Sequence, residues 1–208
     1  VEMLYKNGAQ IIQKPFSVGA RIEHPQKLID KAQYGAFAGH PKLGAADYKL
    51  SCHGLHQRGA YTFCMCPGGT VVAAASEKGG VIVNGMSTLA RDGENANSAL
   101  LVGIDPVDFP SEHPLAGMYY QREIEQNAFA LGGGDYRAPA QLVGDFLADR
   151  ESRALGNVQP TCPTGVTLTN LRYCLPDKVR TTMQAAITEM DKRLHGFALP
   201  DAVLTAPE

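Results

Sequence analysis

This 208-residue sequence lacks the usual signatures of a phosphate-binding loop and of a structural zinc site. No G-x-G-x-x-G follows a predicted strand and opens a helix, and no G-x-x-x-x-G-K-[ST] occurs anywhere. The C-x2-C spacing of zinc knuckles is absent as well. Taken alone, the chain is therefore not expected to hold a dinucleotide in a glycine-rich cradle.

An excess of charge of either sign is also missing. The 19 Lys and Arg residues nearly balance 21 Asp and Glu residues, which gives a formal net charge of −2. This balance argues against nucleic acid or an anionic membrane surface as a partner. No apolar run approaches the roughly 18–20 residues of a membrane-spanning helix, and no signal peptide is recognisable. We expect a cytoplasmic protein with no membrane partner.

Disulfide chemistry is not indicated either. The sequence has five cysteines, an odd number, and no N-x-Ser/Thr glycosylation site. A reduced compartment is therefore favoured over a disulfide framework.

The hydrophobic pattern changes period along the chain, which indicates an α+β fold. Residues 16–23 alternate apolar and polar side chains, as a half-buried strand does. Further strands are predicted over 46–53, 59–66, 70–76, 80–85 and 98–104. Helices are predicted to begin at Pro25, Pro114, Pro139 and Pro176, and three of them to end at Gly35, Gly132 and Gly196. We expect a mainly antiparallel β half followed by a helical half.

These boundaries predict a β-rich subdomain over 16–112 and a helical subdomain over 113–197. The first residues have the pattern of a helix ending at Gly8, and the last ones resemble the beginning of a strand. We therefore expect an excised piece of a longer protein, with 1–15 and 198–208 as its connections.

The segment Cys64-Met65-Cys66-Pro67-Gly68-Gly69 has the densest candidate chemistry. In a regular strand Cys64 and Cys66 share one face, too far apart for a relaxed disulfide. They would stand at a strand end beside a turn whose backbone N–H groups can face a ligand. The alternative is that both cysteines are small buried hydrophobes that pack under the turn.

A zinc site is a further alternative for these cysteines. Cys52, His56, Cys64 and Cys66 give the spacing C-x3-H-x7-C-x-C, with His53 beside the first two. A C-x-C pair on one strand separates its sulfur atoms awkwardly for tetrahedral zinc, so we predict no metal site.

Two polar regions are candidates for ligand recognition. Arg21 and Glu23 share the polar face of the first strand, either as a solvated ion pair or with Arg21 in a cleft that receives a carboxylate. The segment 84–98 is rich in amide and hydroxyl groups, which either bind a ligand or cap turns.

Several of these segments resemble one family. They include KPFSVGARIEHPQ (14–26), LGAADYKL (43–50), YTFCMCPGG (61–69), NGMS (84–87), RDGENANSAL (91–100) and APAQLVGDFL (138–147). In this order they are similar to bacterial FAD-dependent dehydrogenases, over about residues 1–205. In that family a Rossmann-type FAD-binding domain is split in sequence, and an α+β segment is inserted between its halves. The chain resembles this insert.

The resemblance implies flavin oxidoreductase chemistry for the full-length protein, with FAD as cofactor and NAD(P) as a candidate second one. It implies a cap that covers the flavin ring and forms the pocket for a small-molecule substrate. It makes Cys64 and Cys66 candidate catalytic residues and Pro67, Gly68 and Gly69 candidate cofactor-binding residues. Candidate substrate-binding residues are Arg21, Asn84, Met86, Arg91, Asn95 and Asn97.

Two further expectations concern partners. The missing FAD-binding domain should cover an apolar face, and the excised chain should self-associate through the face that bears Phe63, Met65 and Met86. A non-catalytic module that binds a small ligand or a protein remains the alternative function.

Overall fold

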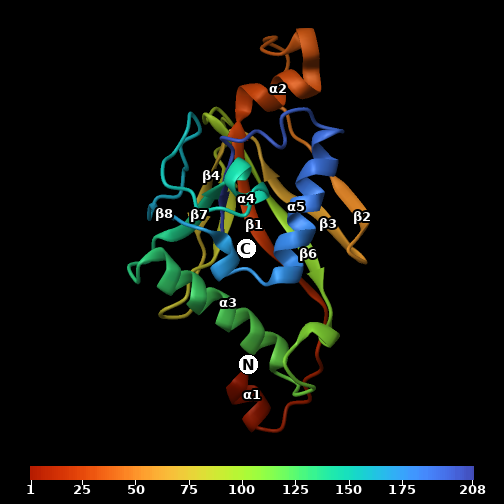
Figure 1. The fold of residues 1–208 in the computed structure, drawn as a ribbon, viewed down its shortest axis with the longest axis vertical. Coiled ribbons are helices and arrows are strands. Elements are labelled where there is room, and N and C mark those ends of the chain that lie inside the picture. The colour runs from red at the N-terminus through yellow and green to blue at the C-terminus, as the bar shows by residue number, and fades with distance from the viewer.

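The computed structural model describes all residues, 1–208, and has nine strands and five α-helices (Figure 1). The strands are β1 (Phe16–Pro25), β2 (Ser51–Leu55), β3 (Arg58–Cys66), β4 (Gly69–Ala73), β5 (Val83–Ser87), β6 (Asn95–Ile104), β7 (Ala138–Leu142), β8 (Val166–Leu168) and β9 (Val203–Thr205). The α-helices are α1 (Glu2–Lys6), α2 (Gln26–Tyr34), α3 (Ala116–Gly132), α4 (Val143–Leu147) and α5 (Asp177–Asp191). Short 3-10 helices are η1 (Gly35–Phe37), η2 (Pro106–Asp108) and η3 (Leu171–Tyr173). The predicted α+β class is confirmed.

Seven strands form one sheet in the order β2-β3-β6-β1-β9-β7-β8, and β4 and β5 form a separate two-stranded ribbon. β1 and β6 pair antiparallel over ten residues, from Phe16 opposite Ile104 to Pro25 opposite Asn95. Alternation in β1 sends Arg21 toward the ribbon, where it bonds Asn84 of β5. His24 points to the other face and bonds the carbonyl oxygen of Phe197, beyond α5. The sheet thus has a ribbon side and a helix side.

The helix α5 covers the helix side of β1, β2, β3 and β6. Its buried residues recur at helical spacing: Val179, Met183, Ala186, Ile187 and Met190. They belong to one cluster of 37 buried apolar residues that draws on both halves of the chain. The 208 residues therefore contain their own continuous core, as an independently folding unit does.

The second half of the chain contributes strands to the same sheet. β9 lies between β1 and β7 and pairs antiparallel with both. Beyond it, the N–H of Ala206 donates to the carbonyl oxygen of Pro139, and Glu208 pairs with Gly19 in both directions. Residues 203–208, part of the segment that was expected to be a connection, thus join β1 to β7 within the sheet.

The helix predicted from Pro139 is wrong in its first half. Ala138–Leu142 is the strand β7, and only Val143–Leu147 is helical, as α4. Neighbours distant in the sequence, β8 and β9, hold β7 in place through ladder hydrogen bonds. The boundaries of β6 and β5 also differ from prediction, because β6 already begins at Asn95 and β5 extends to Ser87.

Two parts project from the body in Figure 1: α1 at the bottom, and α2 with η1 at the top. α1 has no buried residue, and its end at Lys6 agrees with the helix predicted to end near Gly8. No helix has the length and apolar composition needed to cross a bilayer.

Candidate functional site

Arg21 is the centre of a buried polar cluster on the ribbon side of the sheet. Its side chain is fully buried, and all five of its N–H groups have acceptors. Nη1 donates to the Cys64 carbonyl oxygen at 2.8 Å and to Asn97 Oδ1 at 3.2 Å, and Nη2 donates to Asn84 Oδ1 at 3.0 Å. Nε donates to Glu208 Oε2 at 2.6 Å, and Nη2 also bonds Glu208 Oε1. We call Arg21 with these four partners the arginine clamp.

Glu208 supplies the carboxylate of the clamp in a two-point ion pair. Burial raises the pKa of its carboxyl group, while the hydrogen bonds and the charge of Arg21 oppose that rise. Its backbone is fixed as well, because the N–H of Gly19 donates to the Glu208 carbonyl oxygen at 2.8 Å. The ion pair therefore ties the end of the chain to β1.

Neither of the two predicted alternatives describes Arg21. It is not on a solvated surface, and it forms no ion pair with Glu23. It also does not face an open cleft, because the carboxylate in its fork belongs to Glu208 of the same chain. The clamp does unite three of the predicted substrate-binding residues, since Asn84 and Asn97 contact Arg21 directly.

Gly85 allows the ribbon to approach the clamp closely. A Cβ atom on this residue would lie 2.3 Å from Asn97 Oδ1 and 2.5 Å from Arg21 Nη1. Glycine thus lets the backbone of β5 lie directly over the guanidinium group. The ribbon closes one side of the clamp.

Cys64 and Cys66 do not share one face, contrary to prediction. Between Phe63 and Cys66, three steps along β3 match only two along β6, from Ala99 to Asn97, so one extra residue forms a β-bulge. Cys64 has a left-handed backbone with φ +43° and is exposed, whereas Cys66 is buried. The bulge breaks the alternation on which the prediction depended.

The two thiols therefore have different environments. The Cys66 Sγ donates to the carbonyl oxygen of Cys64 at 3.2 Å, and burial raises the pKa of the Cys66 thiol. Cys64 is accessible to solvent, and neither cysteine is in a disulfide. The structural alternative of a small hydrophobe under a turn fits Cys66 and not Cys64.

The turn of Pro67, Gly68 and Gly69 is filled by the chain itself. All three residues are buried, and the N–H of Gly68 donates to Gln26 Oε1 at 2.7 Å. Gly68 has φ +50°, and a Cβ atom there would lie 2.1 Å from the carbonyl oxygen of Arg91. The Gly68 amide that was expected to face a ligand is thus bonded within the fold.

An apolar surface lies beside the clamp on the ribbon side. Phe63 and Met86 are 57% and 61% exposed, and Cys64 lies next to Phe63 in the chain. Phe63 also borders an open hollow of about 520 Å³, whose other lining residues include Phe16, Ser17, Tyr61 and Leu101. We call Phe63, Cys64, Met86 and this hollow the Phe63 surface. Met65, predicted on the same face, is half-buried and packs against the core.

Glu23 is a second buried carboxylate, and its hydrogen bonds to distant residues were not predicted from the sequence. Its Oε1 accepts hydrogen bonds from Thr161 Oγ1 at 2.5 Å and from Asn95 Nδ2 at 3.2 Å. Burial raises the pKa of Glu23 in spite of these bonds. Asn95, predicted to bind substrate, thus bonds Glu23 and also the carbonyl oxygen of Gln159.

Arg91 lies in a separate polar cleft of about 580 Å³. The cleft is bordered by the first turn of α2 and by loops 39–45, 91–95 and 157–159. Lys27, Arg91, Asp92 and Glu94 bring charges of both signs to its lining. Gly68 contacts the backbone of Arg91, so this cleft adjoins the turn that follows the Cys64 bulge.

No group of three or more His, Cys, Asp or Glu side chains has the geometry of a metal site. The alternative zinc set of Cys52, His56, Cys64 and Cys66 is therefore not gathered. The bulge contributes to this separation, because it turns Cys64 outward while Cys66 remains inside.

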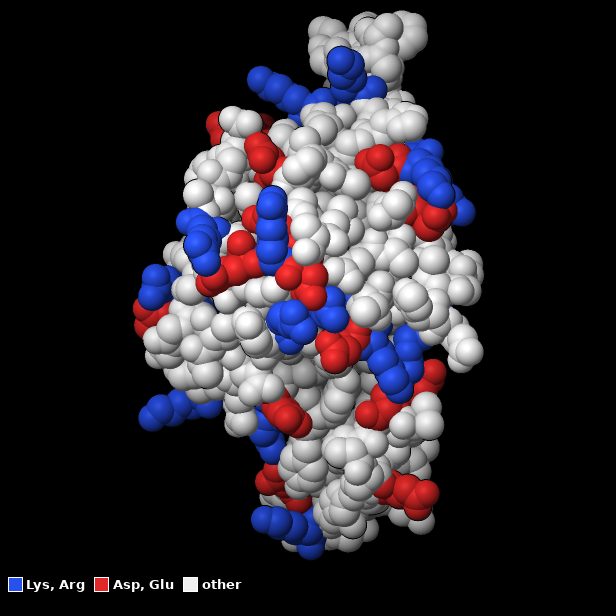
Figure 2. Space-filling model, in the orientation of Figure 1, with Lys and Arg blue, Asp and Glu red and all other residues white.

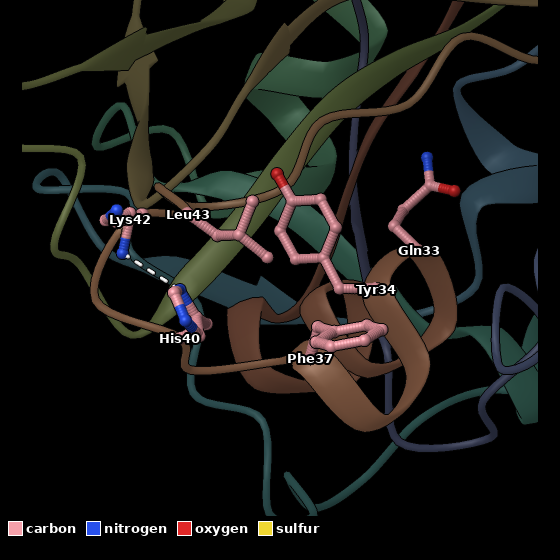
Figure 3. A pocket seen from close by; sticks show the side chains of 6 residues that line it. All are labelled: Gln33, Tyr34, Phe37, His40, Lys42 and Leu43. Atoms are coloured by element: carbon pink, nitrogen blue, oxygen red, sulfur yellow. Dashed lines mark hydrogen bonds between the residues drawn. The ribbon is translucent and has the colours of Figure 1, made fainter.

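The projecting arm of α2 and η1 has an apolar hollow of its own, of about 550 Å³ (Figure 3). Tyr34, Phe37 and Leu43 form its apolar lining, and the N–H of Lys42 donates to His40 Nδ1 at 3.2 Å on one side. Sequence reasoning did not single out this hollow.

On the face shown in Figure 2, acidic and basic side chains are intermixed and form no large patch of one sign.

Comparison with known proteins gives one family match and one similar protein. Residues 15–208 match the family described as "FAD-dependent protein, C-terminal domain-like". A protein of Clostridium beijerinckii, named only as an uncharacterized protein, is 52% identical over 208 residues. The match covers 100% of this chain and 39% of that relative, so the chain spans about two fifths of the relative's length.

Proposed function

The chain belongs to the family of FAD-dependent protein, C-terminal domain-like, and we propose that it covers the flavin in a flavin-dependent oxidoreductase and completes its substrate pocket. The partner in this proposal is the flavin-binding part of the same polypeptide. The length of the relative leaves room for such a part, since this chain spans only 39% of it.

The observation that carries the proposal is the Phe63 surface. Phe63 and Met86 are each more than half exposed, and the strands that carry them, β3 and β5, contact each other. Exposed large apolar side chains on adjoining strands are typical of a contact face. Tyr61 and Phe63 line the hollow, and their rings lie edge to face with the centroids 6.4 Å apart. Aromatic walls suit a planar heteroaromatic ring.

The residues of this surface fit a flavin better than the Pro67–Gly69 turn does. The turn offers no free Gly68 amide, because Gln26 already accepts its hydrogen. By contrast, Phe63 brings an aromatic ring to the hollow, and the next residue in the chain, Cys64, is exposed. In the proposal Cys64 faces the cofactor, and Cys66 supports the bulge from inside.

When bound, the flavin supplies the electron transfer to or from the substrate. The proposed contribution of this chain is to exclude water from the ring and to position the substrate. Phe63, Met86 and Tyr61 would exclude water through their apolar area. The polar cleft, which contains Lys27 and Arg91, is the proposed site for a small polar substrate.

The experiment compares flavin accessibility in the full-length protein. We expect Phe63→Ser to increase the quenching of flavin fluorescence by iodide, because it opens the apolar cover. Phe37→Ser is the matched control, since Phe37 is 69% exposed but lies in the projecting arm. If Phe63→Ser and Met86→Ser leave iodide quenching and FAD content equal to those of Phe37→Ser, the proposal is wrong.

The polar cleft favours a second candidate, a small-ligand module without catalytic function. Its volume of about 580 Å³ is in the range of small-molecule sites. The two candidates differ in one measurement. If a full-length protein that retains FAD shows no reduction by NADH, NADPH or any tested organic donor, while a ligand still protects Arg91 from modification, the binding module is favoured.

A further inference from the structure

The carbonyl oxygen of Cys64 is the point where the clamp acts on the Phe63 surface. Arg21 Nη1 donates to it at 2.8 Å, and the Cys66 thiol donates to the same atom at 3.2 Å. Both donors lie on the buried side of the bulge, since Arg21 and Cys66 are buried. The carbonyl is therefore fixed from inside while the Cys64 side chain remains outside.

Without these bonds the backbone at Cys64 has a more favourable alternative. A left-handed φ of +43° is unfavourable for a residue with a Cβ atom. In a regular strand, residue 64 would lie on the same face as residue 62, and Thr62 is buried. Relaxation of the bulge would therefore turn the Cys64 thiol inward.

The same guanidinium group holds the second component of that surface. Nη2 of Arg21 donates to Asn84 Oδ1 at 3.0 Å, and Asn84 lies two residues before Met86 on β5. The charge of Arg21 is balanced by Glu208, so the group is stable inside the fold. Arg21 thus connects the bulge of β3, the strand β5 and the end of the chain.

We propose that Arg21 is a positioning residue whose hydrogen bond to the Cys64 carbonyl, with Glu208 as its counter-charge, holds the Cys64 thiol outward on the Phe63 surface. The role in a flavin-facing site rests on the proposed function above, whereas the orientation of Cys64 does not. Arg21 touches neither cofactor nor substrate in this proposal. It acts through the backbone of Cys64.

The test measures alkylation of Cys64 by iodoacetamide in the 208-residue chain, with the modified residue located by peptide mass spectrometry. The other four cysteines are buried, so Cys64 provides the fast phase. The main variant is the pair Arg21→Met with Glu208→Gln, which removes both charges and leaves no unpaired buried ion. The matched control is Arg58→Met with Asp108→Asn, which removes the ion pair between β3 and η2.

We expect the double variant of Arg21 and Glu208 to slow alkylation of Cys64 by about fivefold. This is the decrease in the outward, left-handed conformation of Cys64 that loss of its hydrogen bond should produce. The control pair should stay within about twofold of the parent chain. If circular dichroism shows that the main variant does not fold, Arg21→Lys takes its place. We expect the same fivefold slowing of Cys64 alkylation in this variant. It keeps the charge but not the planar fork that reaches Cys64, Asn84 and Asn97 together.

Two results would overturn the inference. One is a folded variant whose Cys64 reacts within twofold of the parent rate. The other is an equal slowing in the control pair, which would show that general loosening of the fold is the cause. Because the 208-residue chain is tested without flavin, neither result bears on flavin covering, and iodide quenching in the full-length protein does not bear on the orientation of Cys64.

Discussion

Arg21 Nη1 donates a 2.8 Å hydrogen bond to the carbonyl oxygen of Cys64, a residue 43 positions further along the chain. This bond joins the buried centre of β1 to an exposed bulge of β3. The polar interior and the apolar Phe63 surface are therefore parts of one arrangement. Changes inside the clamp should be detectable at the surface.

The close approach of Gly85 to the clamp predicts a large cost for Gly85→Ala. The added methyl group would overlap Arg21 Nη1 and Asn97 Oδ1, so the ribbon must move or the clamp must open. We expect a loss of about 2–3 kcal/mol in the free energy of unfolding, measured by urea denaturation. Gly103→Ala is the control, because a Cβ atom there meets nothing within 4 Å. A similar loss in both variants would contradict the close contact.

Because His24 is buried, we expect the free energy of unfolding to depend on pH. Burial lowers the pKa of its imidazole from 6.5 to about 4, so the unfolded chain takes up a proton before the folded one does as the pH falls. The contribution of His24 is complete above pH 6.5 and decreases as the pH falls toward 4, by up to about 3 kcal/mol.

We expect the difference in stability between the parent chain and His24→Gln to shrink or reverse over that range, measured by urea denaturation at several pH values. The raised pKa values of Glu23 and Glu208 act in the opposite direction, because stability from these groups is lost as the pH rises. Both groups are present in parent and variant, so their effect cancels in the difference. A difference that is constant between pH 4 and 6.5 would contradict the buried neutral histidine.

Thr161 supports the buried carboxylate of Glu23. Its Oγ1 donates to Glu23 Oε1 at 2.5 Å and accepts from the N–H of Val71 at 2.8 Å. Thr161→Val leaves both groups with one bond fewer inside the fold, and we expect a loss of about 1–3 kcal/mol by thermal or urea denaturation. Thr70→Val, at an exposed position of β4, should change stability by less than about 0.5 kcal/mol. Equal effects would show that the Glu23 bonds add no net stability.

The two cysteines of the bulge should respond differently to substitution by serine. Cys66→Ser places a hydroxyl group at a buried position and should cost about 1–3 kcal/mol, whereas Cys64→Ser should be nearly neutral because Cys64 is exposed. In the full-length protein we expect Cys64→Ser to lower turnover far more than it lowers the melting temperature. Loss of a positioned group near the reacting atoms costs about 100-fold in rate. If turnover of Cys64→Ser equals that of the parent, Cys64 has no catalytic role.

Much of the fold is predictable from short-range pattern. The alternation of residues 16–23 predicts β1, and the helical spacing of Val179, Met183 and Met190 predicts α5. Both patterns arise from burial of one side of a single element, so they depend on nearby residues alone. The start of β7 was predicted as a helix, because its apolar residues fit both periods and only pairing with β9 and β8 selects the strand.

The sequence by itself determined which residues have the chemistry of the site: a guanidinium group, amides and two thiols, at Arg21, Asn84, Asn97, Cys64 and Cys66. Only the tertiary structure decided how they are arranged. Glu208 reaches Arg21 across 187 positions, and one extra residue in β3 turns Cys64 outward. Neither result leaves a local signal, because an ion-pair partner and a strand register depend on which distant segments pack together, whereas periodicity reports only which side of each element is buried.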